Sequence, residues 1–362
     1  MAKRTALYEQ HLADNGKIVD FAGWEMPLHY GSQLEEHNAV RATAGMFDVS
    51  HMQVVDIVGI DAKKFLRRLL ANDVAKLKPG KALYSCMLNQ QAGVIDDLIA
   101  YDVGSGNYRA VVNAGTAAKD LAWMRQQAVD FSVAVKTRDD LSIIAVQGPK
   151  ARAFAIEFIP KSMQMAVREL KPFWMSMQAD WMVARTGYTG EDGFEIILPN
   201  VEAVNFWRKL LEVGVKPCGL GARDSLRLEA GMNLYGTDMD ESITPLEAGL
   251  AWTLAMTDEH EFIGKQALQD KKASGVTSKF VGLILQDKGI LRGHQKIIVD
   301  GIGKGEVTSG GFSPTLGVSI ALARVPKATN GDCLVEIRRK NLRAKVVKPP
   351  FVRNGKKVFA DE

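Results

Sequence analysis

Two adjacent aspartates inside an apolar strand constrain the fold of this chain more than any other feature. Residues 81–103 read KALYSCMLNQQAGVIDDLIAYDV, in which two apolar runs, 82–89 and 94–102, flank the sequence Gln-Gln-Ala-Gly. Apolar alternation on both sides of a glycine-containing connection is typical of a β-hairpin. Strands disfavour aspartate, so Asp96 and Asp97 need a compensating role. Two roles remain open: acceptance of backbone hydrogen bonds at a strand end, or an acid held in a dry pocket.

The length of the turn decides what Asp97 faces. A four-residue turn puts Cys86 opposite Asp97 and leaves Tyr84 on the same face as Asp97. A turn shorter by one residue moves Tyr84 to the other face. Along the second strand, alternation places Tyr101 on the face of Asp97 and Asp96 on the opposite face. The four-residue turn therefore predicts an acid between two tyrosines.

Length and composition indicate an ordinary globular protein of two or three domains. The chain has 362 residues, 46% of them hydrophobic and 24% charged. Its formal net charge of +4 is too small to suggest a nucleic-acid-binding protein. No apolar run is long enough to span a membrane, and the amino-terminal sequence lacks the apolar core of a signal peptide. With three scattered cysteines and no histidines at metal-ligand spacing, we expect a cytoplasmic protein without a metal site.

The last quarter of the chain differs from the rest in its pattern of apolar runs and turn residues. From Lys279 onward, short apolar runs alternate with Gly, Pro and Asn, which predicts a small antiparallel barrel. Before it, helix and strand patterns are mixed, so the expected fold class is α+β. One such helix opens at a capping box formed by Ser32 and Glu35 and is expected to end at Gly45. We place the boundary between the two parts in the polar stretch 271–278.

Two glycine-rich segments carry further candidate side chains. In residues 185–195, RTGYTGEDGFE, three glycines leave the backbone around Tyr188 open to close approach. In residues 218–229, CGLGARDSLRLE, Arg223 and Arg227 are four residues apart and share one face of a helix. Arginines so placed grip planar or anionic groups, and they also form ordinary salt bridges. Taken singly, each segment favours the structural role.

Six longer sequence blocks carry a resemblance. In chain order they are VDFAGWEMPLHYGS, AGMFDVSHM, GVIDDLIAY, RTGYTGEDGFEI, CGLGARDSLRLEAGMNLYGTDMDE and TSGGFSPTLGVSIALARV. Together they resemble the aminomethyltransferase, or T-protein, of the glycine cleavage system over residues 5–353. Six blocks in the same order are far more specific than any single short motif.

The resemblance implies an α+β fold of three domains in a cloverleaf around a central folate-binding hole. Residues 5–262 would form the folate-binding region from two intertwined α+β domains, and residues 279–358 would form a C-terminal antiparallel β-barrel domain. The implied reaction transfers a methylene group from the aminomethyl-loaded lipoyl arm of an H-protein to tetrahydrofolate. Its products are 5,10-methylenetetrahydrofolate, ammonia and dihydrolipoyl H-protein, and the enzyme would be a monomer or weak homodimer.

Residue roles follow from positions that match the family. Asp97 matches the catalytic acid, whose carboxylate stabilises positive charge on the transferred methylene and orients the attacking folate nitrogen. Asp96 is then structural. Glu195 matches the residue that clamps the pterin edge, and Arg227 matches a folate-contacting arginine. Arg353 is a candidate contact for the glutamate tail, although the sequence around it departs from relatives that carry a tyrosine there. The other matched pocket positions are Tyr84, Tyr101, Asn113 and Tyr188.

Two alternative hypotheses belong to different classes. A folate-binding paralogue that serves iron–sulfur cluster assembly would lack most of the six blocks and would centre on a reactive cysteine motif that this sequence does not contain. The folate half of a demethylating flavoenzyme, such as dimethylglycine or sarcosine dehydrogenase, would belong to a longer chain with a dinucleotide-binding domain. The glycine-rich fingerprint of such a domain is missing from this sequence. The aminomethyltransferase is therefore the leading hypothesis.

Overall fold

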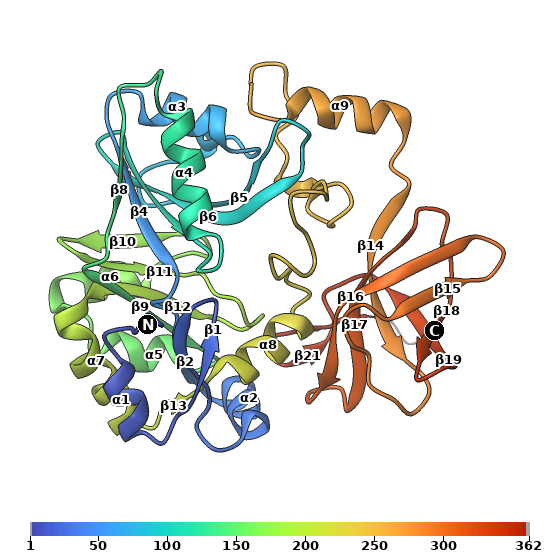
Figure 1. Cartoon of the computed structure of the whole chain (residues 1–362). Helices are drawn as coiled ribbons and strands as arrows, with labels where there is room; N and C mark the ends of the chain where they lie inside the picture. The colour runs from blue at the N-terminus through green and yellow to red at the C-terminus, as the bar shows by residue number, and fades with distance from the viewer. Residues whose placement is uncertain (1, 360–362) are drawn as a thin grey trace.

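Three lobes make up the protein, and each is built around its own sheet (Figure 1). The computed structural model describes residues 2–359. In Figure 1 a five-stranded sheet lies at the upper left, a six-stranded sheet lies below it, and a closed six-stranded barrel lies on the right. This is the predicted α+β fold with a C-terminal antiparallel barrel. Within residues 2–359, no helix is long and apolar enough to cross a membrane.

The five-stranded sheet contains the aspartate hairpin. Its antiparallel strands lie in the order β5-β6-β7-β4-β8. Their bounds are β4 Gln53–Val58, β5 Ala82–Leu88, β6 Val94–Gly104, β7 Asn107–Val112 and β8 Ala134–Thr137. The helices α3 (Ala62–Leu69) and α4 (Ala117–Gln127) pack on this sheet through apolar side chains such as Phe65 and Met124. Burial of these side chains fixes which face of each strand is covered.

From Met87 and Asp96 onward, away from the turn, the hairpin has the register that a four-residue turn predicts, whereas next to the turn a bulge pairs Leu88 with Val94. Cys86 pairs with Asp97, and Tyr84 pairs with Ile99. On one face of β6, alternate side chains pack beneath α3 and α4, and Asp96 belongs to that face. On the other face, Ile99 packs with side chains of the six-stranded sheet. Asp97 therefore faces away from the helices and toward the neighbouring lobe.

The six-stranded sheet forms the second lobe. Its order is β10-β11-β12-β9-β3-β13, and only the short edge strand β13 pairs in parallel with its neighbour among the described strands of this sheet. The bounds are β3 Gly45–Asp48, β9 Leu141–Gln147, β10 Met175–Gln178, β11 Trp181–Ala184, β12 Gly193–Pro199 and β13 Lys216–Pro217. The core of this lobe, which includes Phe194 and Trp207, also takes side chains from α5 Ala151–Ile156, α6 Lys161–Arg168 and α7 Asn200–Glu212.

The barrel closes in the order β14-β17-β16-β15-β18-β19, and each neighbouring pair in this order is antiparallel. Closure leaves no unpaired edge, which explains how short strands can form a stable sheet. The strands are β14 Ser278–Leu285, β15 Lys296–Val299, β16 Gly303–Ser313, β17 Val318–Pro326, β18 Cys333–Ile337 and β19 Lys340–Val347. A short hairpin, β20 Val352–Arg353 and β21 Lys356–Lys357, follows the barrel.

The remaining elements join the lobes. They are α1 Tyr8–Ala13, β1 Lys17–Phe21, β2 Trp24–His29, α2 Gln33–Ala42, the short 3₁₀ helices η1 Val74–Lys76 and η2 Ala251–Thr253, α8 Leu220–Glu229 and α9 Lys265–Ser274. Among them, α8 packs against α2 and β2 and also against β16 and β17 of the barrel. Residues on α8 are thus placed where the lobes meet.

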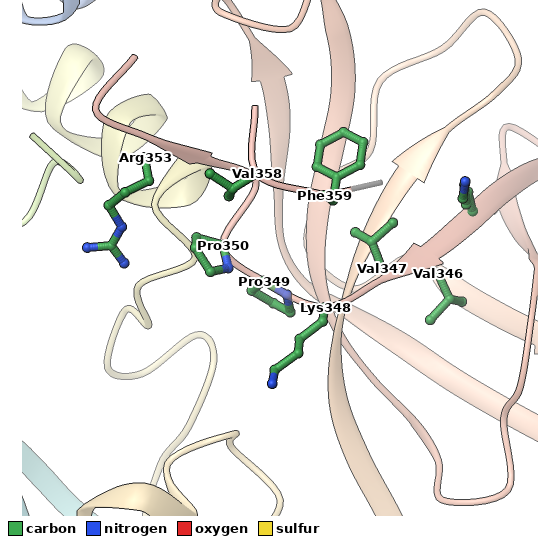
Figure 2. A pocket seen from close by; sticks show the side chains of 9 residues that line it. Val346, Val347, Lys348, Pro349, Pro350, Arg353, Val358 and Phe359 are labelled. Atoms are coloured by element: carbon green, nitrogen blue, oxygen red, sulfur yellow. The ribbon is translucent and has the colours of Figure 1, made fainter. Parts of the chain in front are cut away.

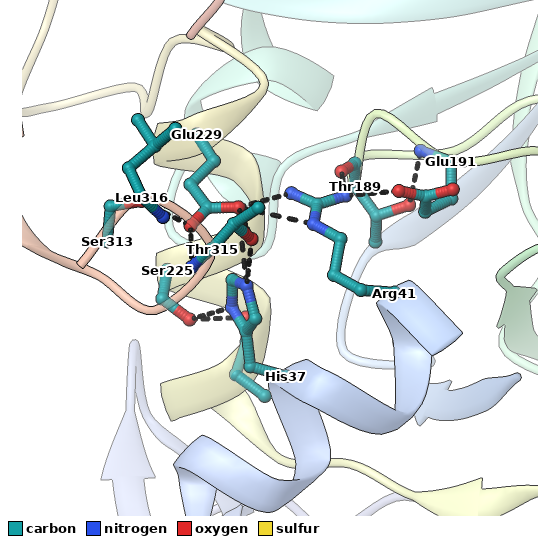
Figure 3. A network of polar contacts seen from close by, with 10 residues as sticks. His37, Arg41, Thr189, Glu191, Ser225, Glu229, Ser313, Thr315 and Leu316 are labelled. Carbon is teal, nitrogen blue, oxygen red and sulfur yellow. Dashed lines mark hydrogen bonds and ion pairs between the residues drawn. The ribbon is translucent and has the colours of Figure 1, made fainter. Parts of the chain in front are cut away.

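A buried polar network centred on Glu229 fastens the barrel to the rest of the molecule (Figure 3). Arg41 and His37 of α2 lie 2.8 Å and 3.3 Å from the Glu229 carboxylate at the end of α8. From the barrel side, the hydroxyl groups of Ser313 and Thr315 donate hydrogen bonds to the same carboxylate. One side chain therefore joins three segments that are far apart in the sequence.

Two local expectations need correction. The helix α2 begins as predicted, with the Ser32 side chain accepting a hydrogen bond at its amino end, but it ends at Ala42. Gly45 starts β3 instead of ending the helix, and a Cβ atom there would lie 2.5 Å from the Val40 side chain, so close packing requires glycine. The polar stretch 271–278 is only partly a linker, because α9 continues to Ser274.

Candidate active site

Two side chains from neighbouring strands converge on the Asp97 carboxylate. The Tyr84 hydroxyl donates a hydrogen bond to Oδ2 at 2.8 Å, and Asn113 Nδ2, just after β7, donates to Oδ1 at 3.0 Å. Burial, followed by the negative charge of Asp96, raises the pKa of Asp97 to about 7. The result is an acid that can change protonation state near neutral pH while its orientation is fixed by hydrogen bonds.

Asp96 has contacts of a structural kind. Its side chain is fully buried, and its two carboxylate oxygens accept hydrogen bonds from the backbone N–H of Asn113 at 3.1 Å and from Asn113 Nδ2 at 2.9 Å. The Asn113 amide therefore bridges Asp96 and Asp97. This bridge fixes the end of β7 against β6 and orients the amide for its contact with Asp97.

We call Asp97, Tyr84 and Asn113 the Asp97 corner. A further aromatic residue, which no sequence pattern singles out, lies against it. The Trp252 ring of η2 stacks on the Tyr84 ring, with centroids 5.5 Å apart and planes 20° apart. Although stacked, the Trp252 residue is 66% exposed, which is unusual for so large an apolar side chain. The only available signal was an aromatic residue in an irregular segment, and that signal is too common to identify a site.

A second group of site residues lines a pocket between β1, α8 and the barrel. The pocket has a volume of about 950 Å³, at the upper end of the usual range for small-molecule sites. Tyr188, Arg223 and Arg227 are among its lining residues. Asp97 is close enough for its charge to contribute to raising the pKa of Tyr188, although burial is the larger cause. The Asp97 corner and the pocket are thus near neighbours.

The two arginines of α8 differ in what they contact. Arg227 is almost fully buried and is held by Asp224, by Asp238 at 3.0 Å and by the Ser309 hydroxyl. The Arg223 guanidinium instead lies over the Tyr188 ring, 4.6 Å from its centroid. Within residues 2–359, Arg223 forms no ion pair, and its hydrogen bond is to a methionine sulfur. Arg223 therefore has a charge that the described residues leave unpaired in the pocket.

Glu195 lies near the middle of the six-stranded sheet and close to both groups. It pairs with Ala184 and Ala145 in the sheet, and its carboxylate accepts a hydrogen bond from the Thr186 hydroxyl at 2.6 Å. Its charge adds to the burial that raises the pKa of Tyr101, which locates Tyr101 beside it. Among the described residues Thr186 occupies only one Glu195 oxygen, so the carboxylate can accept further hydrogen bonds.

Arg353 is not brought together with the other predicted residues. It lies in β20 beside a separate pocket of about 590 Å³ at the end of the barrel, together with Lys348, Pro350 and Phe359 (Figure 2). None of the residues that line the 950 Å³ pocket lines this one. A contact between Arg353 and a folate tail remains a prediction.

Two family models together match most of the chain. The GCVT N-terminal domain matches residues 7–258, and the glycine cleavage T-protein C-terminal barrel domain matches residues 279–353. The chain belongs to the glycine cleavage T-protein family. The resemblance found in the six sequence blocks is thereby confirmed.

Close relatives agree over the whole length of the chain. An aminomethyltransferase of Alcanivorax borkumensis is 57% identical over 362 residues, which cover 100% of both chains. That of Methylococcus capsulatus is 56% identical over 357 residues, 98% of each chain. The crystal structure of glycine cleavage system aminomethyltransferase T from Bartonella henselae superposes with a TM-score of 0.91 at 36% identity and covers 99% of this chain and 100% of that one. This T-protein family member is an aminomethyltransferase of the glycine cleavage system.

Proposed function

We propose that this aminomethyltransferase transfers the methylene of an aminomethyl group from the lipoyl arm of an H-protein to tetrahydrofolate, with release of ammonia. The observation that carries the proposal is the position of Asp97. It is an oriented acid with a pKa near neutrality, next to a pocket large enough for a small organic co-substrate. Family membership supplies the reaction class, and the residues below supply its steps.

Binding of the folate would use a hydrogen-bond acceptor, Glu195, and a cationic donor from α8. Glu195 can accept two hydrogen bonds from the amide-like edge of a pterin ring. Tyr188 and Tyr101 offer flat apolar surface near it. For the anionic part of the co-substrate we propose Arg223 ahead of Arg227, because the nitrogens of Arg227 are already taken by acceptors of the protein. Arg227 would then hold α8 in place for its neighbour.

The role of Asp97 follows from the charge that develops during transfer. As the methylene leaves its first heteroatom, positive charge grows on the carbon, and a nearby carboxylate in a water-poor site stabilises it. The same carboxylate can orient the attacking nitrogen, which lowers the entropic part of the activation barrier. Tyr84 and Asn113 keep the carboxylate in the required direction. The ionised form is the active one in this scheme.

Replacement of Asp97 by Asn tests the proposal. The change keeps the size of the side chain and removes its charge, so kcat should fall by about 100-fold or more while tetrahydrofolate affinity stays within about threefold. The wild-type rate should rise with pH through about 7, as Asp97 ionises, and this rise should be missing from Asp97→Asn. Steady-state kinetics over a pH series and calorimetric titration with tetrahydrofolate measure both effects.

Asp102→Asn is the matched control, because Asp102 lies on the same strand and accepts a backbone hydrogen bond from Gly104. Its kcat and pH profile should stay close to those of the wild type. A loss of folate affinity equal to the loss of rate in Asp97→Asn would contradict the proposed role and make Asp97 a binding residue. Unchanged turnover in that variant would remove the proposal altogether.

A further inference from the structure

A third buried carboxyl group, that of Asp120 on α4, lies behind the Asp97 corner and has no part in the scheme above. Its side chain is fully buried, and neither carboxyl oxygen has a hydrogen-bond partner within residues 2–359. The carboxyl group lies within hydrogen-bonding reach of Asp96. Two carboxyl groups in contact inside a protein are stable only when they share a proton.

The available donors decide which acid carries that proton. Asp96 receives two N–H groups from Asn113, and Asp97 receives one N–H from the same residue as well as a tyrosine hydroxyl. The Thr116 hydroxyl lies beside both Asp96 and Asp120, but it donates to the Asn113 carbonyl at 3.2 Å. Donors favour the ionised form of an acid. In the part of the chain that the structure describes, neither Asp120 oxygen accepts a hydrogen bond, so Asp120 keeps the proton.

We propose that Asp120 is a positioning residue that stays protonated, donates to Asp96 and thereby holds the Asn113 amide against the Asp97 carboxylate. The Asn113 Nδ2 atom lies 2.9 Å from Asp96 Oδ1 and 3.0 Å from Asp97 Oδ1, so a single amide links the two acids. The chain of contacts runs from α4 through β6 to the end of β7. This inference rests on the proposed role of Asp97.

The surrounding charges agree with one retained proton. Burial, followed by the charge of Asp96, raises the pKa of Asp120 to about 9. The ammonium group of Lys119, next in sequence, is bound to Glu241 at 2.7 Å and to the Tyr235 hydroxyl at 2.8 Å. Four further titratable groups near Asp96 and Asp97 have pKa values raised chiefly by burial and are neutral at pH 7: Tyr84, Cys86, Tyr188 and Tyr235.

Two substitutions of Asp120 test whether this residue acts as a hydrogen-bond donor or as a negative charge. In Asp120→Asn the amide can still donate to Asp96, so kcat at neutral pH should stay within about twofold of wild type. In Asp120→Ala the donor is lost, the Asn113 amide is less well held, and kcat should fall by about tenfold with little change in the KM for tetrahydrofolate. Asp130→Asn, at an exposed position shortly after α4, is the matched control and should behave as wild type.

The pH profile distinguishes positioning from a general loss of structure. Wild-type turnover should fall as the pH rises through about 9, because ionised Asp120 would repel Asp96 and release the amide. The fall should be missing from Asp120→Asn, which cannot ionise. An alkaline fall that persists unchanged in Asp120→Asn would overturn the inference.

Infrared spectroscopy tests the proton without any use of turnover. In the Asp97→Asn background, which removes titration of Asp97 itself, a protonated carboxyl C=O band should be present at neutral pH and should disappear when Asp120→Asn is added. If no such band is lost, or if Asp120→Asn loses as much turnover as Asp120→Ala, Asp120 is not a proton-holding donor. Should Asp97→Asn alone retain full activity, the proposed function fails, while the infrared comparison still decides the protonation of Asp120. Both infrared variants are close in shape to the wild-type side chains, so folding of Asp120→Ala is not required for this test.

Discussion

At the scale of single residues, two arginines one helical turn apart on α8 have opposite surroundings. Helical spacing shows that Arg223 and Arg227 lie on one face of α8. It cannot show which of the two forms an ion pair with another part of the protein. Asp238, which lies eleven positions after Arg227 in a neighbouring loop, forms an ion pair with that arginine. Arg223 is left with an aromatic ring and an open pocket. The choice between them is therefore made by a contact outside the helix.

Arg223→Gln and Arg227→Gln should thus differ in kind. Loss of an unpaired charge from the pocket should weaken tetrahydrofolate affinity by about tenfold or more and leave the melting temperature nearly unchanged. Arg227→Gln leaves the buried Asp238 carboxylate without its ion-pair partner, so the main effect of this substitution should be a lower melting temperature. Calorimetric titration and thermal unfolding of both variants measure these outcomes. The opposite pattern would return the folate contact to Arg227.

At the scale of elements, the β5–β6 hairpin aims Asp97 because its turn is locked from two sides. Within the turn, the Asn89 side chain accepts a hydrogen bond from the backbone N–H of Gly93 at 2.8 Å. Outside it, the N–H of Val94 donates to the carbonyl of Asp240 at 3.1 Å. A slip by one residue would exchange the two faces of β6 and turn Asp97 under the helices. The turn thus fixes the direction of the Asp97 side chain, for which we propose the catalytic role.

Gly93→Ala tests this lock. A Cβ atom at Gly93 would lie 1.7 Å from the backbone carbonyl oxygen of Glu241, so the loop must move, and we expect a loss of about 2 to 3 kcal/mol in the free energy of unfolding. Turnover should also fall, because the turn aims Asp97. Gly115→Ala, where the nearest atom would lie at 3.6 Å, should be nearly neutral. Urea denaturation of the two variants checks the difference, and equal stabilities would contradict it.

At the scale of the whole molecule, the Glu229 network couples the barrel to the other lobes. Burial by itself would raise the pKa of Glu229, but its contacts with His37, Ser313 and Thr315 outweigh burial and lower the pKa to about 2. A carboxylate whose pKa is lower in the folded state stabilises that state at pH values above its unfolded pKa, about 4.3. This contribution is lost as the pH falls from there toward 2.

Glu229→Gln should remove the pH-dependent part of this contribution. We expect the variant to lose roughly 3 kcal/mol of stability at neutral pH, because Arg41 would keep its charge in a buried site without this partner. Its stability should then fall less steeply than that of the wild type between pH 5 and about 2. Glu261→Gln, which breaks an ion pair of an exposed glutamate, should cost much less stability than Glu229→Gln. Thermal unfolding across this pH range measures the difference. If the network were unimportant, the stabilities of the wild type and Glu229→Gln would change in parallel with pH.

Local patterns in the sequence were sufficient for much of the architecture. The alternation on both sides of a glycine turn predicted the hairpin and placed Asp96 and Asp97 on opposite faces, because the side-chain period of a strand is a local property. The register, and with it what Asp97 faces, depended on a turn length that the sequence left open. Short apolar runs between turn residues likewise determined the antiparallel barrel. The six blocks determined the family, which the comparisons then established.

Tertiary structure alone decided how the site is completed. Trp252 on Tyr84, Asp120 behind Asp96 and Asp238 on Arg227 are contacts between segments from different elements. Periodicity reports which face of an element a side chain occupies, but not what lies opposite that face. Burial, pairing of charges and retention of a proton all depend on that opposite surface, and here it is supplied by distant parts of the chain.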